Sequence, residues 1–392
     1  MDSIVNQVSD CLHADADTSA DDVHAWINLP PDMCRLILDR LDAFAILLGV
    51  PLVCRPWAEV YTEKPRLQPG APTLLTSPSE FGWEIPDAWE RGLFFVHDIV
   101  LSREEFLVEV EGLRHGKWIG GKDELLVTTD QETYIQLLNP ITGLCIALPY
   151  YPLPWSSGHV KLCRTPTEAG GYFAIAISFF ELAYTMAGCD QWITLDIPTS
   201  YWLSDAMLHR DKITTICRNG DLWSWDLDQE GGNPKLLVSS FINAEGHFYY
   251  FLAPSLNDNI LIVSPYGEDI PIRWSHTGPG LSNHWNFDVD GAVLHEVDID
   301  AQSIEEVRNI GDRALFIGIN YPFYVPVSVP FGDLKKNYVY FADVSEHYVV
   351  AIDLSVEDVP GNVSLINYSG PSNPYQRPMW FRPSFPKEEE IM

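Results

Sequence analysis

Short β-prone runs separated by turn residues dominate the chain from about residue 80 to residue 385. Each run is rich in β-branched, Leu and aromatic side chains and stops at Gly, Pro, Asn or Asp. The clearest runs are Leu125–Thr129, Tyr134–Leu138, Leu144–Leu148, Ile213–Cys217, Leu222–Leu227, Ile260–Val263, Ala314–Gly318, Tyr338–Phe341 and Tyr348–Leu354. Many short strands joined by tight turns argue against a helical protein and favour an architecture that leaves few long strand edges.

Two of the connections are predicted to be tight hairpin turns. The segment from Asn139 to Gly143 separates the second and third runs and reads Asn-Pro-Ile-Thr-Gly. The dipeptide Asn219-Gly220 separates Ile213–Cys217 from Leu222–Leu227. Asn and Gly accept the positive φ angles that such turns need, so both segments indicate antiparallel hairpins.

A degenerate internal repeat accompanies the strand pattern. Three segments end in an apolar-Asp-apolar triplet, which we interpret as a closing strand whose Asp ties the following turn: Trp192–Ile197, Leu222–Leu227 and Tyr348–Leu354. About 306 residues at roughly 40–50 per four-stranded blade correspond to about six or seven blades. We therefore predict a mainly β protein with a β-propeller, and a pair of large β-sandwiches is the alternative.

Residues 25–61 have a different, helical pattern. Leu29 and the two prolines that follow it resemble a helix start, and Met33, Ile37 and Leu41 then recur at four-residue spacing. Two further short helices are expected, the first through Phe44, Leu47 and Leu48 and the second through Val53, Trp57, Val60 and Tyr61. Such a module is too small to bury this apolar surface alone, so it must pack against the rest of the chain or a partner.

These patterns divide the chain into five segments. Residues 1–24 form an acidic tail that we expect to be disordered, and residues 25–61 form the three-helix module. Residues 62–80 are rich in Pro, Thr and Ser and are interpreted as a linker or extended approach to the next domain. The propeller is expected over residues 81–385, followed by a charged tail at 386–392.

Charge and cysteine usage restrict the partners and the compartment. The chain has 24 Lys and Arg against 55 Asp and Glu, a formal net charge of −31, which repels nucleic acid and anionic membranes. The seven Cys are scattered without a C-x-x-C pair, which favours reduced thiols. The first 25 residues lack Lys and Arg, and the longest apolar run is too short to span a bilayer. We expect an intracellular protein of the cytoplasm or nucleus, without a signal peptide or transmembrane segment.

Two segments resemble ligand-binding loops incompletely. Gly116 to Lys122 has the glycine spacing of a phosphate-binding loop, but Asp123 replaces the required Ser or Thr and a strand follows, so we favour a Gly-rich turn. Residues 286–291 resemble the start of a calcium loop, but Val297 occupies the position of the bidentate carboxylate, so we favour a hairpin turn.

No pattern of catalytic residues is present in the sequence. The 11 His are dispersed, with His276 and His284 the closest pair of interest, and neither an H-E-x-x-H nor a G-x-S-x-G motif occurs. We therefore expect a protein that is not an enzyme, with no catalytic residues, no cofactor and no metal.

The helical module resembles an F-box. The residues that carry this resemblance are Trp26, Leu29, Pro30, Asp32, Met33, Ile37 and Leu41, followed by Val53, Cys54, Arg55 and Trp57. The remainder resembles the KIB-type β-propeller found in plant F-box proteins. Its marks are Leu138 to Gly143 with Leu148-Pro149, Ile310 to Gly318, and Lys336 to Phe341.

The resemblance implies an adaptor role. An F-box binds the Skp-type subunit of a cullin–RING ubiquitin ligase, and the propeller is thought to present a target protein. The residues that would form the F-box core or its adaptor-binding surface are Leu29, Pro30, Met33, Ile37, Leu41, Val53, Cys54 and Trp57. The residues that bind the target stay unassigned. Two other readings are a propeller scaffold without ligase coupling and an enzyme or small-ligand binder that uses the central channel.

Overall fold

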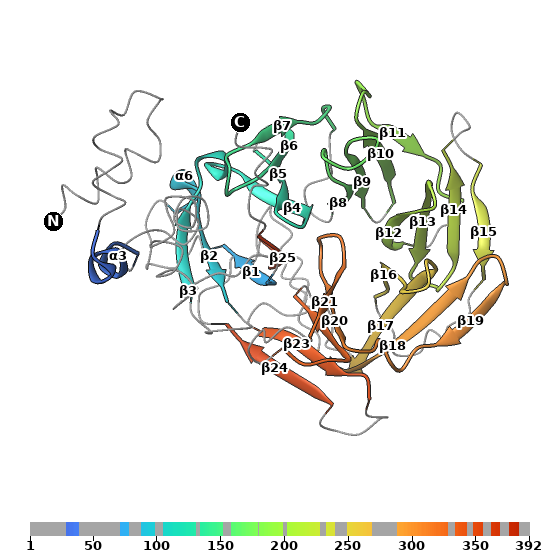
Figure 1. Ribbon diagram of the computed structural model, residues 1–392. Helices are drawn as coiled ribbons and strands as arrows, with labels where there is room; N and C mark the ends of the chain where they lie inside the picture. The colour runs from blue at the N-terminus through green and yellow to red at the C-terminus, as the bar shows by residue number, and fades with distance from the viewer. Residues whose placement is uncertain are drawn as a thin grey trace.

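The computed structural model describes most of the residues from 71 to 383 and a short segment near the N-terminus. The described ranges are 29–38, 71–77, 88–98, 105–130, 134–151, 158–178, 180–198, 202–227, 233–239, 249–268, 288–327, 334–342, 348–355, 362–368 and 376–383. Their strands form six sheets arranged around a common centre, which is a six-bladed β-propeller (Figure 1). The propeller prediction is confirmed, and the alternative of two β-sandwiches is wrong.

The first three blades contain four strands each. Blade 1 is β25 (Met379–Phe381), β1 (Thr73–Thr76), β2 (Leu93–His97) and β3 (Glu105–Glu109). Blade 2 is β4 (Lys117–Lys122), β5 (Leu125–Thr129), β6 (Ile135–Leu138) and β7 (Cys145–Ala147). Blade 3 is β8 (His159–Arg164), β9 (Phe173–Ile177), β10 (Leu182–Met186) and β11 (Ile193–Leu195).

The last three blades follow in chain order. Blade 4 is β12 (Leu203–His209), β13 (Lys212–Cys217), β14 (Leu222–Asp226) and β15 (Lys235–Val238). Blade 5 is β16 (Phe251–Pro254), β17 (Ile260–Glu268), β18 (Asp288–Asp298) and β19 (Ser303–Glu306). Blade 6 has five strands, β20 (Arg313–Ile317), β21 (Phe323–Pro326), β22 (Tyr338–Phe341), β23 (Tyr348–Asp353) and β24 (Val363–Asn367).

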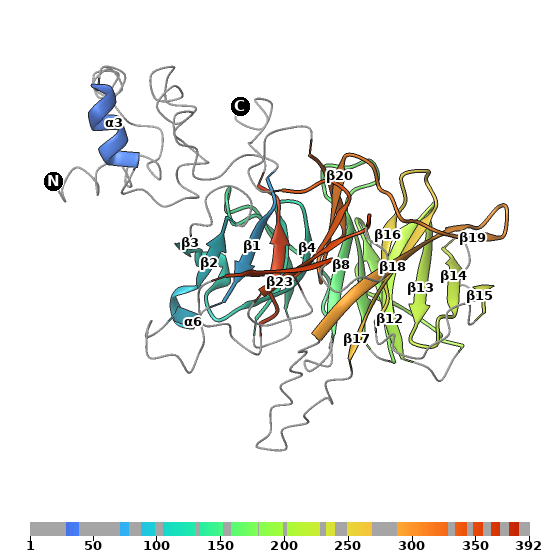
Figure 2. The ribbon, with the colours of Figure 1, turned by 90° about the horizontal axis from the view of Figure 1, so that it is seen from below.

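The strands run between two faces of the ring, which Figure 2 shows from the side. The inner strands β4, β8, β12 and β16 are neighbours around the centre and begin their blades. We call the face where they begin the start face and the face where they finish the end face. Because successive strands in these blades are antiparallel, the connections between second and third strands, and between blades, lie on the start face. The other connections lie on the end face.

The two ends of the propeller segment meet in blade 1. The C-terminal strand β25 pairs antiparallel with β1, with Trp380 opposite Leu74, and the Thr73 hydroxyl donates to the carbonyl of Phe381 at 3.0 Å. β1 lies within residues 62–80, the segment that the sequence indicated as a linker or extended approach. This pairing closes the ring and covers the inner edge of β1.

Apolar side chains fill the junctions between neighbouring blades. Each of six buried clusters fills the junction of two adjacent blades, such as Val127 and Ile135 of blade 2 with Leu162 and Ala176 of blade 3. The cluster between blades 1 and 2 also includes Ile319 from the connection between β20 and β21. Both faces of a blade are therefore buried, which explains why the sequence runs are nearly continuously hydrophobic instead of alternating.

The predicted hairpin at Asn139 is confirmed, with a clear local cause. The Asn139 side chain accepts the backbone N–H groups of Ile141 and Thr142 at 2.9 and 3.1 Å, and Gly143 adopts a φ of 72°. The hairpin at Asn219-Gly220 is confirmed as well, with Gly220 at a φ of 83°. In both turns the residue with positive φ is glycine, which adopts that conformation without a Cβ clash.

Blade 6 brings the two C-terminal marks of the sequence together. β20 and β22 pair in parallel, and Asn337 joins them just before β22 begins. Asn337 has a φ of 61°; its backbone N–H donates to Arg313 at 2.7 Å, and its side-chain oxygen accepts the N–H of Ile310 at 2.8 Å. A residue that tolerates positive φ and offers both a donor and an acceptor is needed here, which suits asparagine.

Little helix occurs among the described residues: α3 (Pro31–Leu38), α6 (Ala88–Arg91) and the short 3₁₀ helix η1 (Glu111–Leu113). α3 is the first helix expected in the N-terminal module, with Pro31 at its first position, where the missing N–H costs nothing. The other two helices of the predicted three-helix module lie outside the described residues.

Two local interpretations of the sequence are corrected. In the incomplete phosphate-binding motif, Gly116 precedes strand β4 and Gly121 lies inside it. A Cβ on the neighbouring Gly120 would stand 1.7 Å from the carbonyl oxygen of Val160. The turn comes only at Asp123 and Glu124. Asp288 and Asp290 lie in strand β18 and not in a hairpin turn. His276 and His284 lie outside the described residues.

The apolar-Asp-apolar triplets are not equivalent in the fold. One triplet follows β11, the fourth and outermost strand of blade 3. The others end β14, the third strand of blade 4, and β23, the fourth of the five strands of blade 6. Asp353 ties the following turn by accepting the N–H of Ser355 at 2.9 Å, and Asp226 forms an ion pair with Lys212 at 3.3 Å. The triplet therefore does not mark one repeated blade position.

Candidate functional site

The centre of the ring is occupied by the connection between β20 and β21, which Figure 1 shows reaching inward. Its Tyr321 donates its backbone N–H to the carbonyl of Gly121 at 2.8 Å, and the Lys122 ammonium lies 5.2 Å from the Tyr321 ring centre. Burial raises the pKa of the Tyr321 hydroxyl, which stays protonated at neutral pH. The hairpin thus connects blade 6 to blade 2 across the centre.

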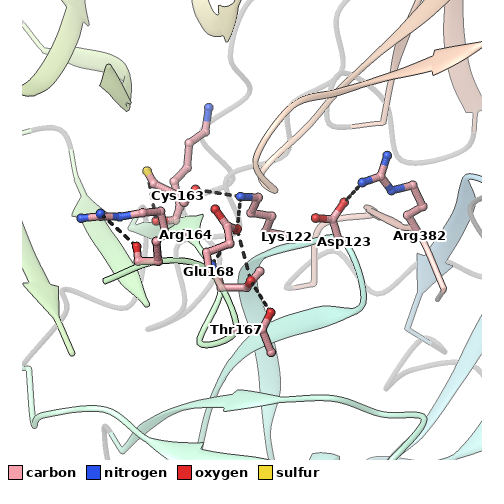
Figure 3. A network of polar contacts seen from close by, with 10 residues as sticks. Lys122, Asp123, Cys163, Arg164, Thr167, Glu168 and Arg382 are labelled. Carbon is pink, nitrogen blue, oxygen red and sulfur yellow. Dashed lines mark hydrogen bonds and ion pairs between the residues drawn. The ribbon is translucent and has the colours of Figure 1, made fainter. Parts of the chain in front are cut away.

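A polar network surrounds this hairpin at the end face (Figure 3). Lys122 donates to the Cys163 carbonyl at 3.0 Å and to Glu168 at 2.5 Å. Burial favours a higher pKa for Glu168, but the hydrogen bonds from Lys122 and Thr165 outweigh it and lower that pKa. Arg382, just after β25, pairs with Asp123 and donates its backbone N–H to that residue's carbonyl at 3.1 Å. These pairs connect blades 1, 2 and 3.

A buried ion pair lies between blades 3 and 4. Lys161 of β8 and Asp205 of β12 are each 1% exposed and form a direct hydrogen-bonded pair. Asp205 also accepts the backbone N–H groups of Ala206 and Leu252, each at 2.8 Å. Leu252 belongs to blade 5, so one carboxylate connects three blades.

The electrostatics of this cluster are those of a structural clamp. Burial favours a higher pKa for Asp205, but Lys161 and His159 outweigh it, so the pKa lies below its usual value and the carboxylate stays ionised. His159 Nε2 lies 3.9 Å from Asp205, and burial lowers the pKa of this imidazole. The Lys161 ammonium and both Asp205 oxygens already have partners, so they serve the fold.

The structure describes four of the eight residues predicted for the F-box. Leu29 is half-buried and Pro30 is exposed just before α3; within the helix Met33 is half-buried and Ile37 is 7% exposed. Met33 and Ile37 stand one helical turn apart, as the spacing predicted. The other four lie outside the described residues: Leu41, Val53, Cys54 and Trp57.

Exposed aromatic side chains gather on the start face. Among the described residues, the three large aromatics that are mostly exposed are Tyr134, Tyr150 and Phe180, at 62%, 62% and 66%. Tyr134 and Phe180 lie between second and third strands, and Tyr150 lies between blades 2 and 3. The exposed leucines of the ring lie instead on outer strands or end-face turns: Leu107, Leu144, Leu236, Leu256 and Leu365.

Phe180 also begins a continuous aromatic row, which we define as Phe180, Trp202, Arg218 and Tyr249. The ring centres of Phe180 and Trp202 are 6.0 Å apart in an edge-to-face arrangement. The Arg218 guanidinium lies 4.7 Å from the Trp202 ring centre and 4.7 Å from that of Tyr249, with a hydrogen bond to the Tyr249 hydroxyl. The aromatic row extends from blade 3 to the beginning of blade 5.

Sequence reasoning did not find this surface. A signal was present, because turns are usually polar and the turn before Glu181 carries an aromatic residue, as does the segment after Leu148-Pro149. The sequence could not show that these turns from different blades share one face.

No metal centre or membrane helix is found in the described part of the chain. No three His, Cys, Asp or Glu side chains there are placed to hold a metal ion together. None of the described helices combines the length and the apolar character needed to cross a bilayer.

The fold defines a six-bladed β-propeller that carries exposed aromatic side chains on its start face. Residues 98–364 match the family model described as KIB1-4 beta-propeller. The chain therefore belongs to the KIB1-4 β-propeller family. The matched region begins after β2 and ends within β24, so it leaves out the strands β1 and β25 that close the ring. No curated protein matches the chain.

Proposed function

We propose that this protein is the substrate-receptor subunit of a Skp–cullin–F-box ubiquitin ligase, in the cytoplasm or nucleus. Residues 25–61 would bind the Skp-type subunit, and through it the cullin and RING subunits. The propeller would hold a target protein on its start face. The chain itself needs no catalytic residue in this role, because a target lysine held near the ubiquitin thioester reacts through proximity.

The gathering of exposed aromatic side chains on the start face carries the interaction part of this proposal. Tyr134, Tyr150 and Phe180 lie there while the ionic groups at the centre are paired with each other. Exposed aromatic side chains cost solvation without stabilising the fold, and aromatic residues are enriched where proteins bind partners. A protein-binding surface accounts for this face better than a channel enzyme does.

The N-terminal helix supports the adaptor part. α3 begins at Pro31, directly after the Pro30 that carries the F-box resemblance, and it contains Met33 and Ile37 at the expected spacing. Leu36 on the same helix is 50% exposed, so the helix offers apolar surface to a partner.

Co-purification of the full chain with a recombinant Skp-type protein tests the proposal. We expect a stable complex with the unchanged chain, and loss of most of the complex for Leu29→Ala combined with Trp57→Ala. Truncation of large interface side chains costs about 2 kcal/mol or more at hot spots. Leu144→Ala, a substitution of an exposed leucine in blade 2, is the matched control and should leave the complex intact. A folded, unchanged chain that binds no Skp-type protein would reject the ligase role.

A propeller scaffold without ligase coupling is the second candidate, and the aromatic face favours it equally. It predicts that the chain captures a target protein while residues 25–61 remain protected from protease without any Skp-type partner. The same purification therefore separates the two candidates.

A further inference from the structure

We propose that the start face over blades 2 to 5 binds a Lys- and Arg-rich segment of the target protein. This inference rests on the proposed function, in that the propeller is taken to hold a target. It adds the chemical class of the segment that is held and the residues that hold it.

The molecule already shows that this face suits a guanidinium. Arg218 lies between the Trp202 and Tyr249 rings, 4.7 Å from each ring centre, in the aromatic row. A cation over an aromatic face within about 6 Å is attracted by the ring quadrupole. The same row continues to Phe180, whose ring is 66% exposed and is therefore accessible to a cation from outside.

Carboxylates accompany the exposed rings. Glu181 follows Phe180 in the turn between β9 and β10 and is exposed, and its charge adds to the burial that raises the pKa of Tyr151. Asp130 accepts the backbone N–H of Tyr134 at 3.0 Å, so a second carboxylate lies in the same turn as a second exposed aromatic residue. A ring and a carboxylate side by side are complementary to a Lys or Arg side chain, since one holds its stem and the other its charge.

The overall charge favours the same partner. The chain has a formal net charge of −31, which attracts a basic segment over long distances and repels an acidic one. An acidic target would therefore meet unfavourable electrostatics, and a purely apolar one would desolvate the exposed Glu181 carboxylate without supplying a cation.

Selection of random 12-residue peptides displayed on phage, with the full chain as bait, tests the inference. We expect the selected peptides to be enriched in Lys and Arg. Synthetic copies of the selected peptides should bind the double variant Phe180→Ala with Glu181→Gln at least about 10-fold more weakly than the unchanged protein, as measured by fluorescence anisotropy. Their affinity should also fall between about 50 and 300 mM salt, because exposed charge pairs are screened.

The matched control is Leu144→Ala combined with Asp190→Asn. It removes an apolar side chain that is 53% exposed and one exposed carboxylate from end-face turns of blades 2 and 3. We expect it to change the affinity less than 2-fold.

Three results would overturn the inference: selected peptides without Lys and Arg enrichment, failure to select any peptide, or equal weakening by both double variants. The last would show unspecific attraction to an acidic protein. The Skp-type co-purification is measured on the same preparation. Loss of that complex with basic-peptide binding retained would reject only the ligase role, whereas the reverse result would reject only this inference.

Discussion

The inner strands and the start face contain the same residue types, aromatic and charged, but use them in opposite ways. At the centre, Lys161 and Asp205 are buried and joined to each other, and the Trp380 indole donates to the Ile317 carbonyl at 3.0 Å. On the start face, Phe180 and Tyr150 lie mostly in solvent. The groups at the centre hold the blades together, whereas those on the start face lie in solvent, where we propose that a partner binds.

The largest effect is expected from the aromatic stack of blade 6. Phe316 is 1% exposed and packs against Phe323, Tyr340 and Trp380, with ring centres 4.8–5.1 Å away. Phe316→Ala should lower the free energy of unfolding by about 4 kcal/mol, because it removes a large buried side chain and leaves a cavity. Urea denaturation measures this. A loss below about 1 kcal/mol would show that the junction between blades 6 and 1 does not depend on the stack.

The buried ion pair should have the next largest effect. Lys161→Met keeps the length of the side chain but leaves Asp205 buried without its cation, which should lower the free energy of unfolding by about 3 kcal/mol. Adding Asp205→Asn removes the unpaired charge and should restore part of that loss, as a double-mutant cycle in urea denaturation would report. If Lys161→Met were as stable as the unchanged protein, the clamp between blades 3 and 4 would be dispensable.

A smaller and pH-dependent effect is expected from His97 in blade 1. Burial lowers the pKa of His97 to about 4, although Glu105 lies 3.8 Å away and favours the charged form. The unfolded chain takes up this proton below about pH 6.5, and the folded chain only near pH 4, so stability falls as the pH decreases through that window. Between pH 7.5 and 5.5 this histidine should account for about 1 kcal/mol.

The difference in that loss between the unchanged protein and His97→Asn measures the contribution. His115→Asn replaces an exposed histidine and is the control, which should retain the full dependence on pH. Identical pH profiles for all three proteins would contradict the assignment to His97.

The smallest effect on stability is expected on the start face. Phe180→Ala removes a ring that is 66% exposed, so the free energy of unfolding should change by no more than about 0.5 kcal/mol. The comparison with Phe316→Ala uses the same substitution in a buried and an exposed setting. A loss similar to that of Phe316→Ala would show that Phe180 serves the fold, and the contrast between the two regions would fail.

The sequence by itself determined the local structure of the propeller. The runs Leu125–Thr129 and Tyr338–Phe341 are strands with those bounds, and the turns at Asn139 and Asn219 form as predicted. Such features depend on residues a few positions apart, namely the β propensity of each run and the tolerance of Asn and Gly for positive φ. The helix at Pro31 follows from the same kind of local signal.

Only the tertiary structure decided how distant segments meet. Leu74 pairs with Trp380, Asp205 meets Lys161 from 44 residues away, and Gly120 is required because the backbone of Val160 passes beside it. The aromatic row likewise collects side chains from loops of blades 3 to 5. Local patterns carry no information on these contacts, because each blade could pack against many others until closure of the ring fixes its neighbours.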